Sequence, residues 1–140
     1  QRSLEDAGHR LQERQLCPDD RYQIRRELSR WIADPAVDVV ITSGGTGLTG
    51  RDGTPEAVAP LLDKTIEGFG ELFRVLSFES IGTSTLQSRC LAGVANGTFV
   101  FVLPGSLDAV TTAWNLLIRA QLDADTRPCN LAQLRARLKE

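Results

Sequence analysis

The segment Ser43–Gly53 has the composition and the position of a phosphate-binding loop. It reads SGGTGLTGRDG and follows the mostly β-branched run Val37–Ile41 through Thr42. Glycines without side chains allow successive backbone N–H groups to converge on one point, which makes a concave site for an anion. The loop has neither the GxxxxGK[ST] lysine of a nucleoside triphosphatase nor the GxGxxG spacing of a dinucleotide site. The sequence therefore predicts a phosphate site of another design, with a simple tight turn as the alternative.

Asp52 is the acidic residue inside this loop. A carboxylate would repel a phosphate unless a divalent cation lies between the two, so Asp52 is predicted to be a ligand of Mg²⁺. The alternative is a surface acid near the start of the next helix, where the helix dipole favours negative charge. Asp19 precedes another helical pattern and has the corresponding alternative of a helix N-cap.

A second junction of this kind is Pro104-Gly105-Ser106, which follows the apolar run Phe99–Leu103. In a parallel sheet the two junctions would open at the same edge, where one ligand could contact both. Ser106 acting only as a helix N-cap is the alternative. His9 is the only histidine and is interpreted as a solvated helix residue, which excludes histidine-based triads and zinc sites.

The elements that must position these segments alternate between helical and strand patterns. Apolar residues recur every three to four positions in the predicted helices and form continuous runs in the predicted strands. Asn96-Gly97 between two apolar runs is the signal of a tight hairpin. This alternation predicts an α/β fold in which a sheet lies between two layers of helices. The predicted helices cover 4–11, 19–34, 54–62, 69–76 and 106–118, and the strands 37–41, 91–95 and 98–103, with a strand or turn at 15–17 and a polar tail from 123.

Composition limits the classes of function. The 140 residues, with 41% hydrophobic and 24% charged side chains, suffice for a single domain over 1–140. A net charge of -2 provides no positive field for a polyanion, which argues against a nucleic-acid partner. The uncharged stretch Cys90–Leu107 contains Asn96, Gly97 and Pro104, so no membrane span is predicted.

The three cysteines lack metal-binding spacing, which predicts reduced thiols and a cytoplasmic protein. Cys90 and Cys129 are interpreted as packing residues. The chain contains no methionine and begins inside a helical pattern, so we expect its natural N-terminus to be missing.

Several motifs together resemble the MoaB/MogA family of molybdenum-cofactor biosynthesis proteins, and the likeness covers nearly the whole chain. They are Thr42–Gly47, Arg51-Asp52, Thr54-Pro55-Glu56, Glu67–Glu71 and Leu103–Ser106. Within the family the chain resembles the MoaB branch most, through Gly82–Arg89, Gly93–Asn96 and Arg127–Asn130.

The resemblance implies a doubly wound, mostly parallel (mixed) sheet, whose natural N-terminal strand is missing from this chain, and assembly into a homotrimer or homohexamer. It also implies binding of molybdopterin, a pterin that bears a dithiolene and a terminal phosphate. Active relatives adenylylate molybdopterin with Mg²⁺ and ATP and release pyrophosphate.

The family's two key aspartates match Asp19 and Asp52, which would hold or orient the metal. By the same likeness Ser43 and the amides of Gly44, Gly45, Thr46 and Gly47 would hold phosphate, and Pro104, Gly105 and Ser106 would face the other substrate. Glu71 would support the pocket. The alternative to the enzyme is a non-catalytic carrier or scaffold that binds molybdopterin and passes it on.

Overall fold

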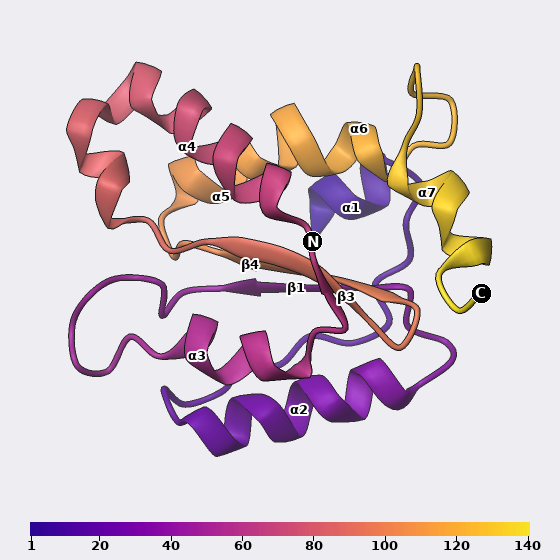
Figure 1. Ribbon diagram of the computed structural model, residues 1–140, viewed down its shortest axis with the longest axis horizontal. Coiled ribbons are helices and arrows are strands. Elements are labelled where there is room, and N and C mark those ends of the chain that lie inside the picture. Colours follow the sequence, from indigo (N-terminus) through magenta and orange to yellow (C-terminus); the bar gives the residue numbers. More distant parts are fainter.

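The computed structural model describes residues 1–140 and has one four-stranded sheet between two layers of helices (Figure 1). The spatial order of the strands is β1-β4-β3-β2. Parallel pairing is confined to β1 and β4, whereas β4 with β3 and β3 with β2 are antiparallel. The expected mixed sheet with helices on both faces is confirmed. The strands are β1 (Val39–Ser43), β2 (Lys64–Thr65), β3 (Leu91–Ala95) and β4 (Thr98–Leu103).

The predicted hairpin joins β3 to β4. Asn96 and Gly97 have φ values of 49° and 78°, the left-handed conformation that both residues of this two-residue turn require. The turn sets Ala95 opposite Thr98. All six residues of β4 are buried, which explains why its sequence is continuously apolar rather than alternating.

One face of the sheet is covered by α2 (Arg21–Ala33) and α3 (Thr54–Val58), which continues into the 3-10 turn η1 (Ala59–Leu61). The α2 helix contributes Ile24 and Leu28 to a core shared with β1, β3 and β4. The predicted helix over 19–34 is thus confirmed.

The N-cap of α2 is the neighbour of the residue considered in the sequence. The N-cap of α2 is Asp20, whose carboxylate accepts the Gln23 N–H at 2.8 Å, so the N-cap alternative for Asp19 is wrong. The α3 helix is preceded by Gly53 as N-cap, and Thr54 is already helical.

The other face is covered by a helix that starts as α5 (Leu107–Ala113), widens into the π-helical turn η3 (Trp114–Ile118) and ends as α6 (Arg119–Gln121). Beside it lie α4 (Glu67–Ile81) and the short α1 (Arg2–Asp6) (Figure 1). The core on this face includes Phe69 and Phe73 of α4, and the ring of Phe69 meets Phe101 edge-on at 5.3 Å. No helix is both long and apolar enough to cross a membrane.

Several expectations fail at the ends of the chain. The first helix stops at Asp6, because Gly8 follows with a φ of +84°, and no strand forms at 15–17. His9 is half-buried outside any helix and meets the Trp114 ring at 5.9 Å, so its assignment as a solvated helix residue is wrong. Cys90 is buried as predicted, but Cys129 is exposed and is not a packing residue.

The predicted polar tail contains α7 (Leu131–Leu134) and the 3-10 turn η4 (Arg135–Arg137). Asn130 is almost fully buried and caps α7, since its side-chain oxygen accepts the Gln133 N–H at 2.8 Å. Its amide nitrogen donates to the carbonyls of Ala124 and Thr126. These contacts order the segment without a large apolar face.

Candidate functional site

Two loops lie against each other at the carboxyl ends of β1 and β4. The Gly44 N–H donates to the Leu103 carbonyl at 2.9 Å, and the Ser43 hydroxyl donates to the Pro104 carbonyl at 3.2 Å. A Cβ at Gly105 would lie only 3.4 Å from the Gly44 Cα. The prediction that the two junctions share one edge of the sheet is therefore confirmed, and it follows from the parallel pairing of these strands.

The glycine loop is closed at its base by a tight approach to α3. Gly45 has a φ of +70°, and a Cβ there would be 2.2 Å from the Thr54 hydroxyl oxygen. The Thr54 N–H donates to the Gly45 carbonyl at 3.1 Å, which joins the two ends of the loop. Only glycine fits this position without displacing α3.

Two of the four amides predicted to cradle a phosphate are free. The Gly44 N–H is bound to Leu103, and Gly47 lies beside the Asp52 carboxylate. The N–H groups of Gly45 and Thr46 donate to no acceptor within the protein. Thr46 itself is 4% exposed, so most of this residue is enclosed by the protein.

The Asp52 carboxylate turns inward across the glycine loop. Its Oδ2 accepts the Thr49 hydroxyl at 2.6 Å and the Thr49 N–H at 3.0 Å, and a Cβ at Gly47 would be 2.7 Å away. The Thr49 side chain, followed by its N–H, holds the pKa of Asp52 below its usual range. The Gly47 N–H contributes to the same lowering of the pKa, the carboxylate is therefore ionised at neutral pH, and Oδ1 accepts from no side chain.

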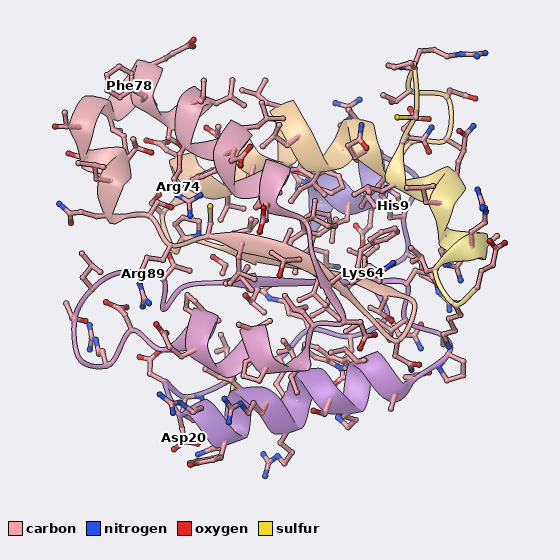
Figure 2. The ribbon with its side chains drawn as sticks, in the orientation of Figure 1. His9, Asp20, Lys64, Arg74, Phe78 and Arg89 are labelled. Carbon is pink, nitrogen blue, oxygen red and sulfur yellow. The ribbon has the colours of Figure 1, made fainter.

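One ionised carboxylate beside free amides fits a Mg²⁺ ion, which proteins usually bind through one or two carboxylates together with substrate phosphates. Neither here nor elsewhere in the chain do three His, Cys, Asp or Glu side chains form a group that could hold a metal by themselves. Asp19 is exposed, without a hydrogen bond or ion pair, and immediately precedes the Asp20 cap of α2. Asp20 lies toward the same end of the molecule as Arg89 (Figure 2).

Arg89 is the functional candidate that the sequence interpretation missed. It follows the 3-10 turn η2 (Gly82–Gln87), and its guanidinium donates to the carbonyls of Gly47 and Asp52, each at 2.9 Å. It also forms an ion pair with Glu56, and this pairing lowers the pKa of the Glu56 carboxyl. The motif Gly82–Arg89 was visible in the sequence, but nothing in it indicated contacts more than 30 residues away.

The remaining predicted residues have simpler surroundings. The Ser106 hydroxyl accepts the Ala109 N–H at 3.2 Å, so Ser106 is the N-cap of α5. Glu71 is exposed on α4 and forms no hydrogen bond or ion pair. Pro104 and Gly105 contact the glycine loop through their backbone.

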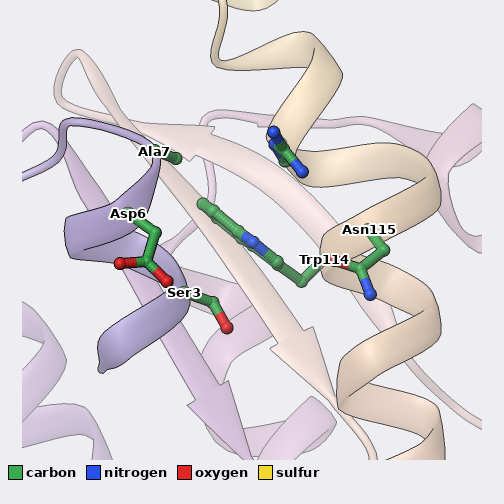
Figure 3. A pocket seen from close by; sticks show the side chains of 6 residues that line it. Ser3, Asp6, Ala7, Trp114 and Asn115 are labelled. Atoms are coloured by element: carbon green, nitrogen blue, oxygen red, sulfur yellow. The ribbon is translucent and has the colours of Figure 1, made fainter.

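Two cavities lie elsewhere. One of about 190 Å³ surrounds Trp114 between α1 and η3 (Figure 3). A larger one, of about 460 Å³, lies between the end of α2, the hairpin turn and the C-terminal helices. It includes Asp34, Asp38, Asn96, Arg135 and Lys139. Neither cavity includes a residue of the two loops.

The chain is similar in sequence to known proteins. Residues 1–124 match a protein family described as a probable molybdopterin binding domain. The molybdenum cofactor biosynthesis protein B of Escherichia coli (strain K12) is 56% identical over 128 residues, which are 91% of this chain and 75% of that protein.

Solved structures agree with the sequence match. A crystal structure of a molybdenum cofactor biosynthesis protein B has a TM-score of 0.83 at 44% identity and covers 86% of this chain and 76% of its own. A structure of MogA has a TM-score of 0.74 at 33% identity, over 82% of this chain and 74% of its own.

Proposed function

The chain belongs to the MoaB/MogA family of molybdenum-cofactor biosynthesis proteins with a molybdopterin-binding domain, and we propose that its two abutting loops hold the phosphate of molybdopterin. The match to this family confirms the resemblance found in the sequence. The observation that carries the proposal is the pair of free N–H groups at Gly45 and Thr46, beside the loop Pro104–Ser106. Buried or fixed amides without acceptors are natural donors for phosphate oxygens.

The finer proposal is that the protein adenylylates molybdopterin with ATP and releases pyrophosphate. The glycine loop would position one phosphate and the N-terminal amides of the α5–α6 helix would position the other, so that the pterin phosphate attacks the α-phosphorus in line. Mg²⁺ would supply positive charge for the departing pyrophosphate. Asp52 would hold this ion through its Oδ1, and Asp19 would orient it from the start of α2.

A carrier function is the second candidate, and the engagement of Asp52 with Thr49 favours it. An acid that only stabilises the loop would make these same two hydrogen bonds. The carrier would use the same amides for molybdopterin but would bind no nucleotide.

Assembly into a homotrimer or homohexamer forms part of the proposal. One side of α4 exposes Leu72, Val75, Phe78 and Ile81, each between 54% and 61% exposed, and Leu86 of η2 follows at 82%. Phe78 projects outward at the end of the molecule (Figure 2). An apolar stripe of this kind is typical of a subunit interface. Sedimentation of Phe78→Asp should show smaller particles than the parent protein, and unchanged particles would exclude this surface.

The decisive test of function is pyrophosphate release from ATP in the presence of molybdopterin, with and without Mg²⁺. The enzyme should release pyrophosphate only with both molybdopterin and Mg²⁺, whereas the carrier should bind molybdopterin in calorimetry without releasing any. No affinity for molybdopterin under either condition would exclude both functions.

A further inference from the structure

We propose that Arg89 is a positioning residue that fixes the glycine loop from Gly47 to Asp52 and thereby keeps the free amides of Gly45 and Thr46 in place for anion binding. The inference rests on the proposed function and assigns a new role within that site. Arg89 side-chain atoms contact two carbonyls of the loop and one carboxylate that follows it. Its side chain is 28% exposed, so its main neighbours are protein atoms rather than water.

The hydrogen bonds of Arg89 fix the direction of several peptide groups. In a trans peptide the C=O and the following N–H point in opposite directions. Because the carbonyls of Gly47 and Asp52 point to the guanidinium, the next amides, of Leu48 and Gly53, point away from it. The main-chain N–H of Arg89 also donates to the Thr46 carbonyl at 3.3 Å, so the following N–H, of Gly47, points away from Arg89.

The three acceptors occupy all three nitrogens of the guanidinium. Nε donates to Gly47, one terminal nitrogen donates to Asp52, and the other pairs with Glu56. Three of the five N–H donors of the guanidinium are therefore directed at the loop and at Glu56. A lysine at this position would keep the charge but could not reach three acceptors in a planar arrangement.

A second arginine holds Arg89 in place. Arg74 of α4 donates to the carbonyls of Ser88 and Cys90, each at 3.0 Å, which are the two residues that flank Arg89. Gly70 makes room for it, since a Cβ there would be 2.5 Å from the Arg74 guanidinium. Both arginines lie at the glycine-loop end of the molecule (Figure 2). The guanidinium groups of Arg74 and Arg89 thus connect α4 to the glycine loop.

The test compares Arg89→Lys with Arg25→Lys as a matched control. Arg25 also donates to two carbonyls, those of Glu56 and Ala57, but neither belongs to the glycine loop. Hydrogen exchange without ligand would follow the amides of Asp52 and Thr54, which are bonded to Thr49 and Gly45. Calorimetry with molybdopterin would measure affinity in the same variants.

In Arg89→Lys we expect the Asp52 and Thr54 amides to exchange about tenfold faster and the affinity for molybdopterin to fall about tenfold. Arg25→Lys should leave both unchanged. Arg74→Lys should change both in the same direction as Arg89→Lys but by less. Wild-type exchange and affinity in Arg89→Lys would show that charge alone suffices and would overturn the proposal.

Should Arg89→Lys fail to fold, Glu56→Gln tests the same arrangement, because it weakens one acceptor and leaves the carbonyls in place. Faster exchange at Asp52 and Thr54 in this variant supports the proposal, and wild-type exchange contradicts it. The exchange measurement needs no ligand. If the parent protein binds no molybdopterin, the proposed function fails, while the role of Arg89 in ordering the loop is still decided.

Discussion

The two ends of the sheet differ in how their polar groups are satisfied. At the carboxyl ends of β1 and β4, the Gly45 and Thr46 N–H groups have no partner within the protein, and one oxygen of Asp52 accepts from no side chain. At the opposite end, Arg135 pairs with Asp38 at 2.5 Å, and Asn96 is bonded to Asp63 and Ile32. The larger cavity lies at this second end.

The comparison shows that the size of a hollow and the capacity to bind an anion are separate properties. A cavity lined by paired charges binds a charged ligand with little gain in free energy, because the ligand must first break those ion pairs. A phosphate that accepts from unpartnered amides displaces water but breaks no hydrogen bond within the protein. The glycine-loop end is therefore the end at which we expect molybdopterin.

The largest effect is expected for Asp52→Ala. If this carboxylate holds Mg²⁺, its loss should lower Mg²⁺-dependent pyrophosphate release about a hundredfold or more. Asp52→Asn separates metal binding from stabilisation of the loop, since the amide oxygen can still accept from Thr49 but carries no charge. Asp38→Ala, at the opposite end, is the control and should leave the rate unchanged. Parental rates in both Asp52 variants would remove Asp52 from catalysis.

Gly45→Ala should abolish molybdopterin binding and lower the free energy of unfolding by about 1–3 kcal/mol, because of its positive φ and the close contact with Thr54. Denaturant unfolding and calorimetry would measure both. Gly50→Ala is the matched control, since no heavy atom lies within 4 Å of a Cβ there. A Gly45→Ala protein that binds like its parent would show that the loop adopts another conformation.

Gly97→Ala applies similar strain at the opposite end. Its φ is +78°, and the Cβ would lie 2.8 Å from the flexible Lys139 side chain, so we expect a loss of about 1 kcal/mol in stability. Affinity for molybdopterin should not change. Weaker binding in this variant, at equal fold content by circular dichroism, would contradict the separation of the two ends.

The smallest expected effect is a loss of stability at acidic pH. Arg89 lowers the pKa of the Glu56 carboxyl, so the folded state favours the ionised form. The stabilisation is then complete above the pKa of the unfolded state and is lost as pH falls through the folded pKa. Its size should stay within ~1 kcal/mol, since the pair is partly exposed. Carbon-detected NMR should give a higher Glu56 pKa in Arg89→Gln, and an unchanged value would exclude the pairing in solution.

Much of the fold followed from local signals. The Asn96-Gly97 turn, the buried β4 strand, the α2 helix and the Ser106 cap depend on neighbours in sequence, and all four are confirmed. Local rules failed where two neighbouring residues compete for one role. Asp20 rather than Asp19 caps α2, and nothing in the sequence separates the two.

The missed features depend on contacts between distant parts of the chain. Asn130 is the exception, because it orders the C-terminal turn through the nearby carbonyls of Ala124 and Thr126. Arg89 contacts residues 33 to 42 positions away, and no spacing rule predicts such contacts. The sequence did predict the glycine loop and its neighbour Pro104–Ser106, because parallel strands bring their carboxyl ends to one edge.

An amide NMR titration with molybdopterin tests the central idea most directly, because it reports every N–H group at once. The predicted result is a set of downfield shifts at Gly45 and Thr46, with further changes at Gly105 and Ser106. Changes confined to the cavity around Asn96, Arg135 and Lys139, with the glycine loop unaffected, would contradict it.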